Sequence, residues 1–155
     1  MKYIKLFNES DNYYNYDEIK NVVKYCLIAQ NYSDAAKGIT IYKDELHYKQ
    51  IEKILYNDNL SYNQIKNDLY YYKSFYLVKA VKVAKNAKID VYLDEDEKGY
   101  EVLYFEFPFG QVSFHFYDDY WLNQLPNNVI KEKHKWDGLK DTRDILLKAY
   151  KNIKM

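Results

Sequence analysis

Residues 100–117 decide the fold, and they read Tyr-Glu-Val-Leu-Tyr-Phe-Glu-Phe-Pro-Phe-Gly-Gln-Val-Ser-Phe-His-Phe-Tyr. Residues alternate in character on both sides of Pro108-Phe109-Gly110, which predicts a β-hairpin that turns at this tripeptide. Directly opposite residues of an antiparallel pair share a face, so the pairing defines one apolar surface. The pairs expected on that surface are Phe107 with Val112, Phe105 with Phe114 and Leu103 with Phe116. We expect one or two helices to pack against it.

The opposite face of the hairpin gathers the candidate site. The same register places on it Glu106 beside Ser113, Tyr104 beside His115 and Val102 beside Tyr117, with Gln111 at the turn end. Further along, the chain carries Trp136-Asp137-Gly138, and a loop folded over this face would wall a pocket. The predicted binding residues are therefore Tyr104, Gln111, Ser113, His115, Trp136 and Asp137. The alternative is a face that is merely solvated, as in many antiparallel sheets, with Trp136 covering the sheet edge.

Helical periodicity predicts the remaining scaffold. We expect helices over residues 17–30 and 44–56, and a third helix opened by a capping box of Ser61 and Gln64. That helix either continues with a bend or is followed by a fourth helix capped by Ser74, and a last helix begins near Thr142. Short strands are expected over residues 39–42 and 89–93. The prediction is an α+β domain whose small antiparallel sheet, the hairpin 100–117 plus the strand near 89–93, packs with about four to five helices.

Length and cysteine content set the broad class of the protein. At 155 residues the chain fits a single domain, 1–155, and a helical N-terminal subdomain over residues 1–60 is the alternative organisation. Cys26 is the only cysteine, which predicts a reducing compartment and no disulfide framework. No signal-like N-terminus and no membrane-spanning apolar run is visible. We therefore expect a cytoplasmic protein that does not use a membrane.

Charge is balanced over the whole chain but uneven locally. With 23 basic and 23 acidic side chains, no global field attracts nucleic acid, which argues against it as a partner. Four lysines recur every three residues and predict a basic stripe on one side of a helix: Lys79, Lys82, Lys85 and Lys88. The stripe is either a surface for an acidic partner or the solvated face of an amphipathic helix. The acidic run at residues 94–97 is expected to be an exposed hairpin loop.

Few residues suggest catalysis. The candidates for acid–base chemistry are His115, Asp137 and Glu106, and a hydrolase would add Ser113 or His134. Ser113 and His115 stand two apart on one strand, about 6.5 to 7 Å from each other, which is too far for a direct hydrogen bond. No ligand spacing indicates a metal, so we predict neither metal nor cofactor. A histidine in a structural hydrogen-bond network is the alternative.

The second half of the chain resembles a group of known sequences. The run Pro108-Phe-Gly-Gln-Val-Ser-Phe-His115, followed by Trp136-Asp-Gly138, is similar to small proteins of phages and bacterial mobile elements. Those proteins typically read Pro-x-Gly-Gln-x-Ser-Trp-His and later Trp-Asp-Gly-His-Thr. This chain has Phe114 in place of their Trp and Leu139 in place of their His, and Thr142 comes later than their Thr. The resemblance covers residues 75–150 and implies a phage or mobile-element origin and a shared surface, without implying a reaction.

Two classes of function follow. The first is a non-enzymatic binding protein of phage or mobile-element type, which binds a host protein, for example as an inhibitor of a host defence factor, or a small ligand. The alternative is a small hydrolase or nucleotide-processing enzyme that uses His115 with Asp137 or Glu106. A nucleic-acid binder would show steep salt dependence, and the neutral charge disfavours it.

Overall fold

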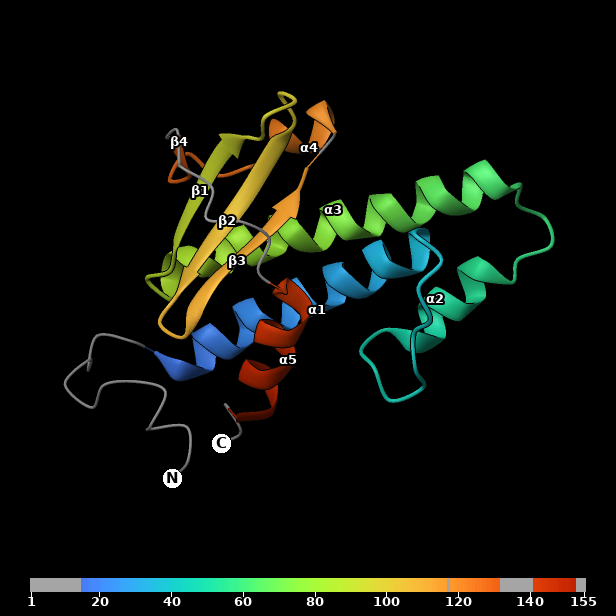
Figure 1. Ribbon diagram of the computed structural model, residues 1–155, viewed down its shortest axis with the longest axis horizontal. Coiled ribbons are helices and arrows are strands. Elements are labelled where there is room, and N and C mark those ends of the chain that lie inside the picture. Colours follow the sequence, from blue (N-terminus) through green and yellow to red (C-terminus); the bar gives the residue numbers. More distant parts are fainter. Residues whose placement is uncertain (1–14, 117, 132–140, 153–155) are drawn as a thin grey trace.

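The computed structural model describes residues 15–116, 118–131 and 141–152. The long helices α1 (Tyr16–Ala36) and α3 (Tyr62–Asn86) run side by side, and a four-stranded sheet lies across one end of the pair (Figure 1). The short helix α2 (Tyr48–Leu55) packs at the other end, and α5 (Thr142–Asn152) packs against α1 and the nearest strand. The fold is α+β, as the order of elements predicted.

The sheet has the order β3-β2-β1-β4. Its strands are β1 (Asp90–Glu95), β2 (Glu101–Phe107), β3 (Gly110–His115) and β4 (Ile130–Lys131). The three long strands are antiparallel neighbours, and the two-residue β4 adds a short parallel pairing to β1, so the sheet is mixed. The one-turn helix α4 (Asp119–Leu122) follows β3 and was not predicted. β3 stands at the edge of the sheet, so no described strand pairs with its outer side.

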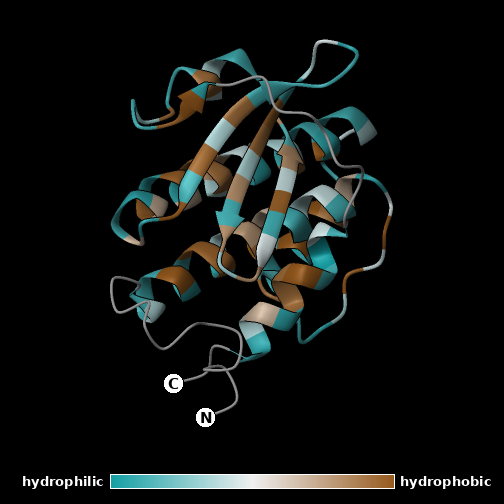
Figure 2. Cartoon of the chain, turned by 60° about the vertical axis from the view of Figure 1, so that its left-hand side comes forward, coloured by the Kyte–Doolittle hydropathy of each residue, from teal (hydrophilic) through white to brown (hydrophobic). Residues whose placement is uncertain are grey.

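The predicted hairpin exists, but its register is wrong by two residues. Phe107 pairs with Gly110, and the next apolar pairs are Phe105 with Val112 and Leu103 with Phe114. The turn therefore holds only Pro108 and Phe109, where a four-residue turn had been assumed. Because side chains alternate with a period of two, a shift by two leaves each residue on its predicted face. The apolar face is the core face, as expected (Figure 2).

Local signals explain where the long helices begin and end. The Asn15 side chain accepts hydrogen bonds from the backbone N–H of Asp17 (3.1 Å) and of Glu18 (3.3 Å), so Asn15 caps α1. Gly38, with φ of +81°, follows the end of the helix, in a conformation that glycine adopts without strain. The Ser61/Gln64 capping box is present at the start of α3. Ser74 lies buried inside α3 and caps nothing, so the two open alternatives resolve to one helix.

Two predictions for the connecting segment are wrong. Residues 39–42 form no strand, and Ile39 and Tyr42 are 53% and 67% exposed. This β-branched run has no neighbouring strand to pair with, so its propensity stays unused. Helix α2 begins only at Tyr48, because His47 adopts a left-handed conformation with φ of 63°. Nor is the acidic run at residues 94–97 all loop, since Asp94 and Glu95 belong to β1 and Asp94 is buried.

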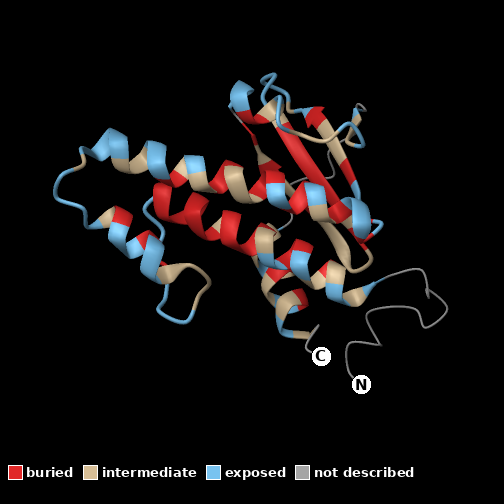
Figure 3. Cartoon of the chain, turned by 180° about the vertical axis from the view of Figure 1, so that it is seen from behind, coloured by how far each residue is buried: buried red, intermediate tan, exposed pale blue. Residues whose placement is uncertain are grey.

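Two apolar clusters stabilise the described residues, and α1 and α3 contribute to both. The larger cluster joins these helices, α5 and the sheet, with Phe105 and Phe116 among the largest fully buried side chains. The smaller one joins the distal halves of α1 and α3 to α2 around Tyr32, which is fully buried. Figure 3 shows buried residues along most of α1, and its polar residues near the C-terminal end are buried too: Asn31, Ser33 and Asp34. Buried polar groups need hydrogen-bond partners, and Arg143, described below, is one for both Asn31 and Asp34.

Candidate functional site

The structure separates two of the candidate catalytic residues. Glu106 pairs with Gln111 across the hairpin, and the Gln111 amide donates a hydrogen bond to the Glu106 carboxylate. His115 pairs instead with Val102, four residues further along the sheet. Four residues of strand span about 13 Å, so Glu106 does not reach His115. The expected neighbours also differ, because Tyr104 lies opposite Ser113 and not opposite His115.

The polar face of the hairpin is less open than expected. Tyr104 is 2% exposed and Val102 is fully buried, although both point away from the helices. Burial, together with the nearby charges of Asp94 and Asp96, raises the pKa of the Tyr104 hydroxyl. Ser113 and His115 remain partly exposed on the edge strand. Trp136, Asp137 and His134 fall within residues 132–140, outside the described residues.

His115 has a carboxylate partner that sequence analysis did not name. The partner is Asp96, which lies in the loop between β1 and β2, and its Oδ2 is 3.2 Å from His115 Nε2. Hydrogen bonds from the backbone N–H groups of Tyr100 and Lys98 lower the pKa of Asp96, and His115 lowers it further. An ionised carboxylate therefore orients the imidazole.

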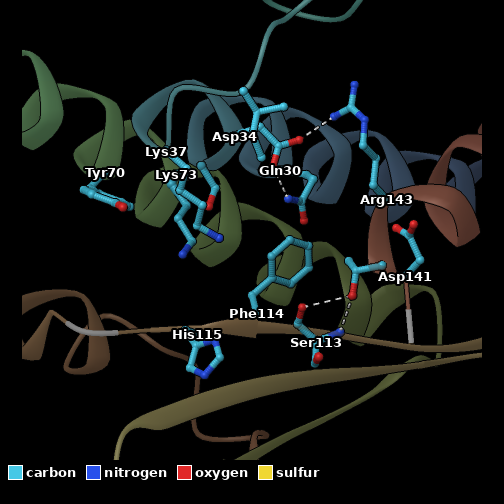
Figure 4. Close-up of a pocket in the computed structure, with 13 residues that line it drawn as sticks. Gln30, Asp34, Lys37, Tyr70, Lys73, Ser113, Phe114, His115, Asp141 and Arg143 are labelled. Carbon is cyan, nitrogen blue, oxygen red and sulfur yellow. Dashed lines mark hydrogen bonds and ion pairs between the residues drawn. The ribbon is translucent and has the colours of Figure 1, made fainter. Parts of the chain in front are cut away.

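A cavity of about 410 Å³ opens between the edge strand and the helices (Figure 4). We call it the β3-edge cleft. Four parts of the chain line it: the end of α1 and the following loop, α3, β3 and the start of α5. The polar residues that matter below are Asp34, Lys37, Lys73, Ser113, His115 and Arg143. Of these, only Ser113 and His115 had been predicted as site residues.

The edge of β3 is closed beside the cleft by one hydroxyl. Thr142 Oγ1 donates a hydrogen bond to the Ser113 carbonyl (3.2 Å) and accepts one from the Ser113 N–H (3.3 Å). The first residue of α5 thus takes the place of a neighbouring strand at this point. The contact fixes the start of α5 against β3 and so fixes the wall of the cleft.

An ion-pair network joins α1 to α5 beside the cleft. Arg143 Nη1 donates to Asp34 Oδ2 (2.8 Å) and to Asn31 Oδ1 (2.9 Å), and Nη2 pairs with Glu45. The other oxygen of Asp34 accepts a hydrogen bond from Gln30 at 2.8 Å. Asp34 is only 4% exposed, so its charge depends on these donors. The guanidinium turns away from the cleft in Figure 4, which leaves other cations to face it.

Those cations are Lys37 and Lys73. Figure 4 shows both side chains extending from the helices toward β3. Lys73 is 5% exposed, and the Tyr70 ring lies 5.7 Å from its ammonium. Burial lowers the pKa of Lys73 from 10.5 to about 8, the Lys37 charge lowers it as well, and Asp34 opposes the change. Two like charges therefore converge on the cleft, one of them desolvated.

Lys73 had not been predicted as a site residue, but one sequence signal could have identified it. It stands four residues from both Leu69 and Leu77, and both leucines are buried on the inner face of α3. A lysine within such an apolar stripe is unusual, because lysine is almost never fully buried without a partner. Lys37, Asp34 and Arg143 carried no comparable signal.

The predicted lysine stripe lies elsewhere. Lys79, Lys82, Lys85 and Lys88 are all exposed, and none lines the cleft. The ammonium of Lys79 lies 5.0 Å above the Phe75 ring. Within the described ranges no group of three or more His, Cys, Asp or Glu side chains is arranged to hold a metal ion. Nor does any described helix combine the length and apolar character needed to cross a membrane.

Comparisons with known proteins give one match. Residues 41–149 match the family described as the WDGH domain, which is more than two thirds of the chain. The matched range contains α2, α3, the whole sheet and most of α5. Spelled in residues, the description reads Trp-Asp-Gly-His, and the chain has Trp136-Asp137-Gly138-Leu139. No curated protein and no solved structure matches the chain.

Proposed function

The chain belongs to the WDGH domain family, and we propose that it is a non-enzymatic binding protein that holds a small anionic ligand in the β3-edge cleft. The observation that carries the proposal is the convergence of Lys37 and the buried Lys73 on one cavity. An anion bound between the two ammonium groups would lower the electrostatic cost of a desolvated ammonium next to a second cation. The cavity favours a small ligand over a host protein as the bound species. The phage origin and the inhibition of a host defence factor stay predictions.

The other charges around the cleft support an anion at the lysines. Two acids line the cleft, Asp34 and Asp141. The carboxylate oxygens of Asp34 accept hydrogen bonds from Arg143 and Gln30, and Asp141 Oδ1 accepts one from the Asp144 N–H. Both carboxylates are therefore engaged by donors other than the two lysines. At about 410 Å³ the cleft is within the range of roughly 300 to 1,000 Å³ typical of small-molecule sites.

The test is calorimetric titration with inorganic phosphate and with pyrophosphate at constant ionic strength. The Lys73→Met variant removes the buried charge, and Lys82→Met removes an exposed charge of the same helix as the matched control. We expect Lys73→Met to weaken pyrophosphate binding at least tenfold and Lys82→Met to change it less than twofold. Equal weakening in both variants would mean nonspecific attraction, and no binding to the unmodified chain would end the proposal.

A second candidate function rests on the His115–Asp96 pair. His115 is among the residues that line the cleft, and a carboxylate holding an imidazole is an arrangement used by general bases, so the His115–Asp96 pair replaces the predicted pairing of His115 with Glu106. An enzyme of this kind would hydrolyse the bound ligand. His115→Asn and Asp96→Asn would then abolish turnover of a pyrophosphate-containing substrate with folding unchanged. In a binding protein neither variant nor the unmodified chain shows turnover.

A further inference from the structure

A second cavity adjoins the β3-edge cleft. It measures about 580 Å³ and lies between α3, the end of β3 and α4. We call it the Tyr71 cavity. Three residues line both cavities, Tyr70, Lys73 and His115, so the two spaces adjoin at these residues. A ligand anchored at Lys73 therefore has room on either side of it.

The Tyr71 cavity offers an aromatic surface that is both exposed and held in place. Tyr71 is 51% exposed, yet its ring makes edge contacts with Tyr72 (5.5 Å) and Trp121 (5.3 Å). Trp121 itself is buried, at 7% exposure, and so anchors the contact. An exposed ring with restricted motion is a platform on which a planar ring can stack.

The remaining polar groups of the Tyr71 cavity differ from those of the cleft. They are Asn67 and Ser74 on α3 and the carboxylates of Asp118 and Asp119, at the N-cap and first position of α4. One Asp118 oxygen caps α4 by accepting a hydrogen bond from the Tyr120 N–H at 2.9 Å. Asp119 is exposed. Carboxylates repel phosphate but accept hydrogen bonds from amino groups, including the exocyclic amino groups of adenine and cytosine.

The two cavities thus have complementary chemistry at their two ends. Building on the proposed anion site, we infer that together they bind a nucleoside phosphate. Its phosphate sits between Lys37 and Lys73, and its base stacks on Tyr71 with an amino group toward Asp118 and Asp119. The acidic end prevents the reverse orientation, because a phosphate there would face carboxylates. Adenine is preferred over hypoxanthine, because hypoxanthine has an acceptor oxygen at the position of the adenine amino group and this oxygen is repelled by the carboxylates.

The experiment is calorimetric titration of the full chain with AMP, IMP, adenosine and inorganic phosphate at constant ionic strength. We expect AMP to bind at least tenfold more tightly than phosphate or adenosine alone, and severalfold more tightly than IMP. Tyr71→Ala should weaken AMP at least fivefold and leave phosphate unchanged, whereas Lys73→Met should weaken both. Tyr62→Ala is the matched control, since Tyr62 is exposed on α3 outside both cavities.

The outcomes separate this inference from the proposed function. If phosphate binds through Lys73 but AMP binds no more tightly, the nucleotide inference is overturned and the anion site stands. An AMP affinity that Tyr71→Ala leaves unchanged also overturns the inference. If adenosine equals AMP and Lys73→Met has no effect on either, both the inference and the anion site fail.

Discussion

Replacing Lys73 with methionine should make the protein more stable. A pKa lowered from 10.5 to about 8 means that the folded protein disfavours the ammonium by about 3 kcal/mol at pH 7, at about 1.4 kcal/mol per pH unit. Methionine is unbranched and apolar, so it fills a similar space among the buried residues of α3 without a charge. The Lys73→Met variant should therefore gain up to about 3 kcal/mol in unfolding free energy, or roughly 6 to 12 °C in melting temperature.

The stability advantage of Lys73→Met over the original protein should depend on pH. Because the pKa of Lys73 is lower in the folded state, the unfolded chain binds more protons between pH 8 and 10.5, and the original protein gains stability as pH rises there. The variant has no Lys73 to titrate, so its stability does not rise in this way. The difference in unfolding free energy between the two proteins should therefore be largest below pH 8 and shrink above it. The charged groups facing Lys73, namely Lys37 and Asp34, are unchanged in the variant. The tyrosines also remain, so their titration cancels in the difference between the two proteins.

Urea denaturation at pH 7, 8.5 and 9.5 measures the difference directly. Lys82→Met, on the exposed side of α3, should stay within about 0.5 kcal/mol of the original protein at every pH. A Lys73→Met variant that is less stable at pH 7 would refute the reasoning, because it would mean that the ammonium stabilises the fold. A gap that does not change with pH would do the same.

Three further perturbations test the groups that build the cleft. Arg143→Ala strips the buried Asp34 of its cation and should lower the unfolding free energy by about 3 kcal/mol in urea denaturation, whereas a loss below 1 kcal/mol would contradict the network. Thr142→Val removes the hydroxyl at the β3 edge and should cost about 1 to 2 kcal/mol and expose the Ser113 amide to hydrogen exchange; Thr142→Ser should restore both. Burial lowers the pKa of His47, so as pH drops below about 6.5 the unfolded chain binds a proton before the folded protein does, and the unfolding free energy falls. His47→Phe should remove this part of the pH dependence, as measured by urea denaturation at pH 7.5 and 5.5.

Sequence reasoning succeeded where a signal is local. The alternation in residues 100–117 determines which face of the sheet each side chain occupies, because any even shift of the register preserves the faces. It does not determine burial, since Val102 and Tyr104 are buried on the outer face. The Ser61/Gln64 capping box lies within one turn of the chain, so it was readable directly. The register itself was not, since alternation alone does not say how many residues the turn at Pro108 contains. Residues 39–42 show the opposite failure, a strand-like run to which the fold brings no partner.

The cleft was beyond such reasoning because its parts are distant in sequence. Asp34 and Arg143 are 109 residues apart and neither belongs to a motif. Their contact exists because α5 packs against α1, and that packing is set by the whole apolar core. Charged residues at the ends of helices are common, so nothing marked these two before the fold was known.

Lys73 is the exception for which the sequence holds a signal, a charge within the Leu69–Leu77 stripe, although it had not been predicted as a site residue. Local consistency calls for an apolar residue there, and places where a chain breaks such a rule are often functional. A structural lysine and a binding lysine predict different results for the same substitution. If Lys73 only fills space or pairs with a neighbour, Lys73→Met leaves phosphate binding unchanged. If Lys73 binds the ligand, Lys73→Met raises the unfolding free energy and weakens ligand binding in the same variant. This combination is expected of a binding residue that destabilises the fold.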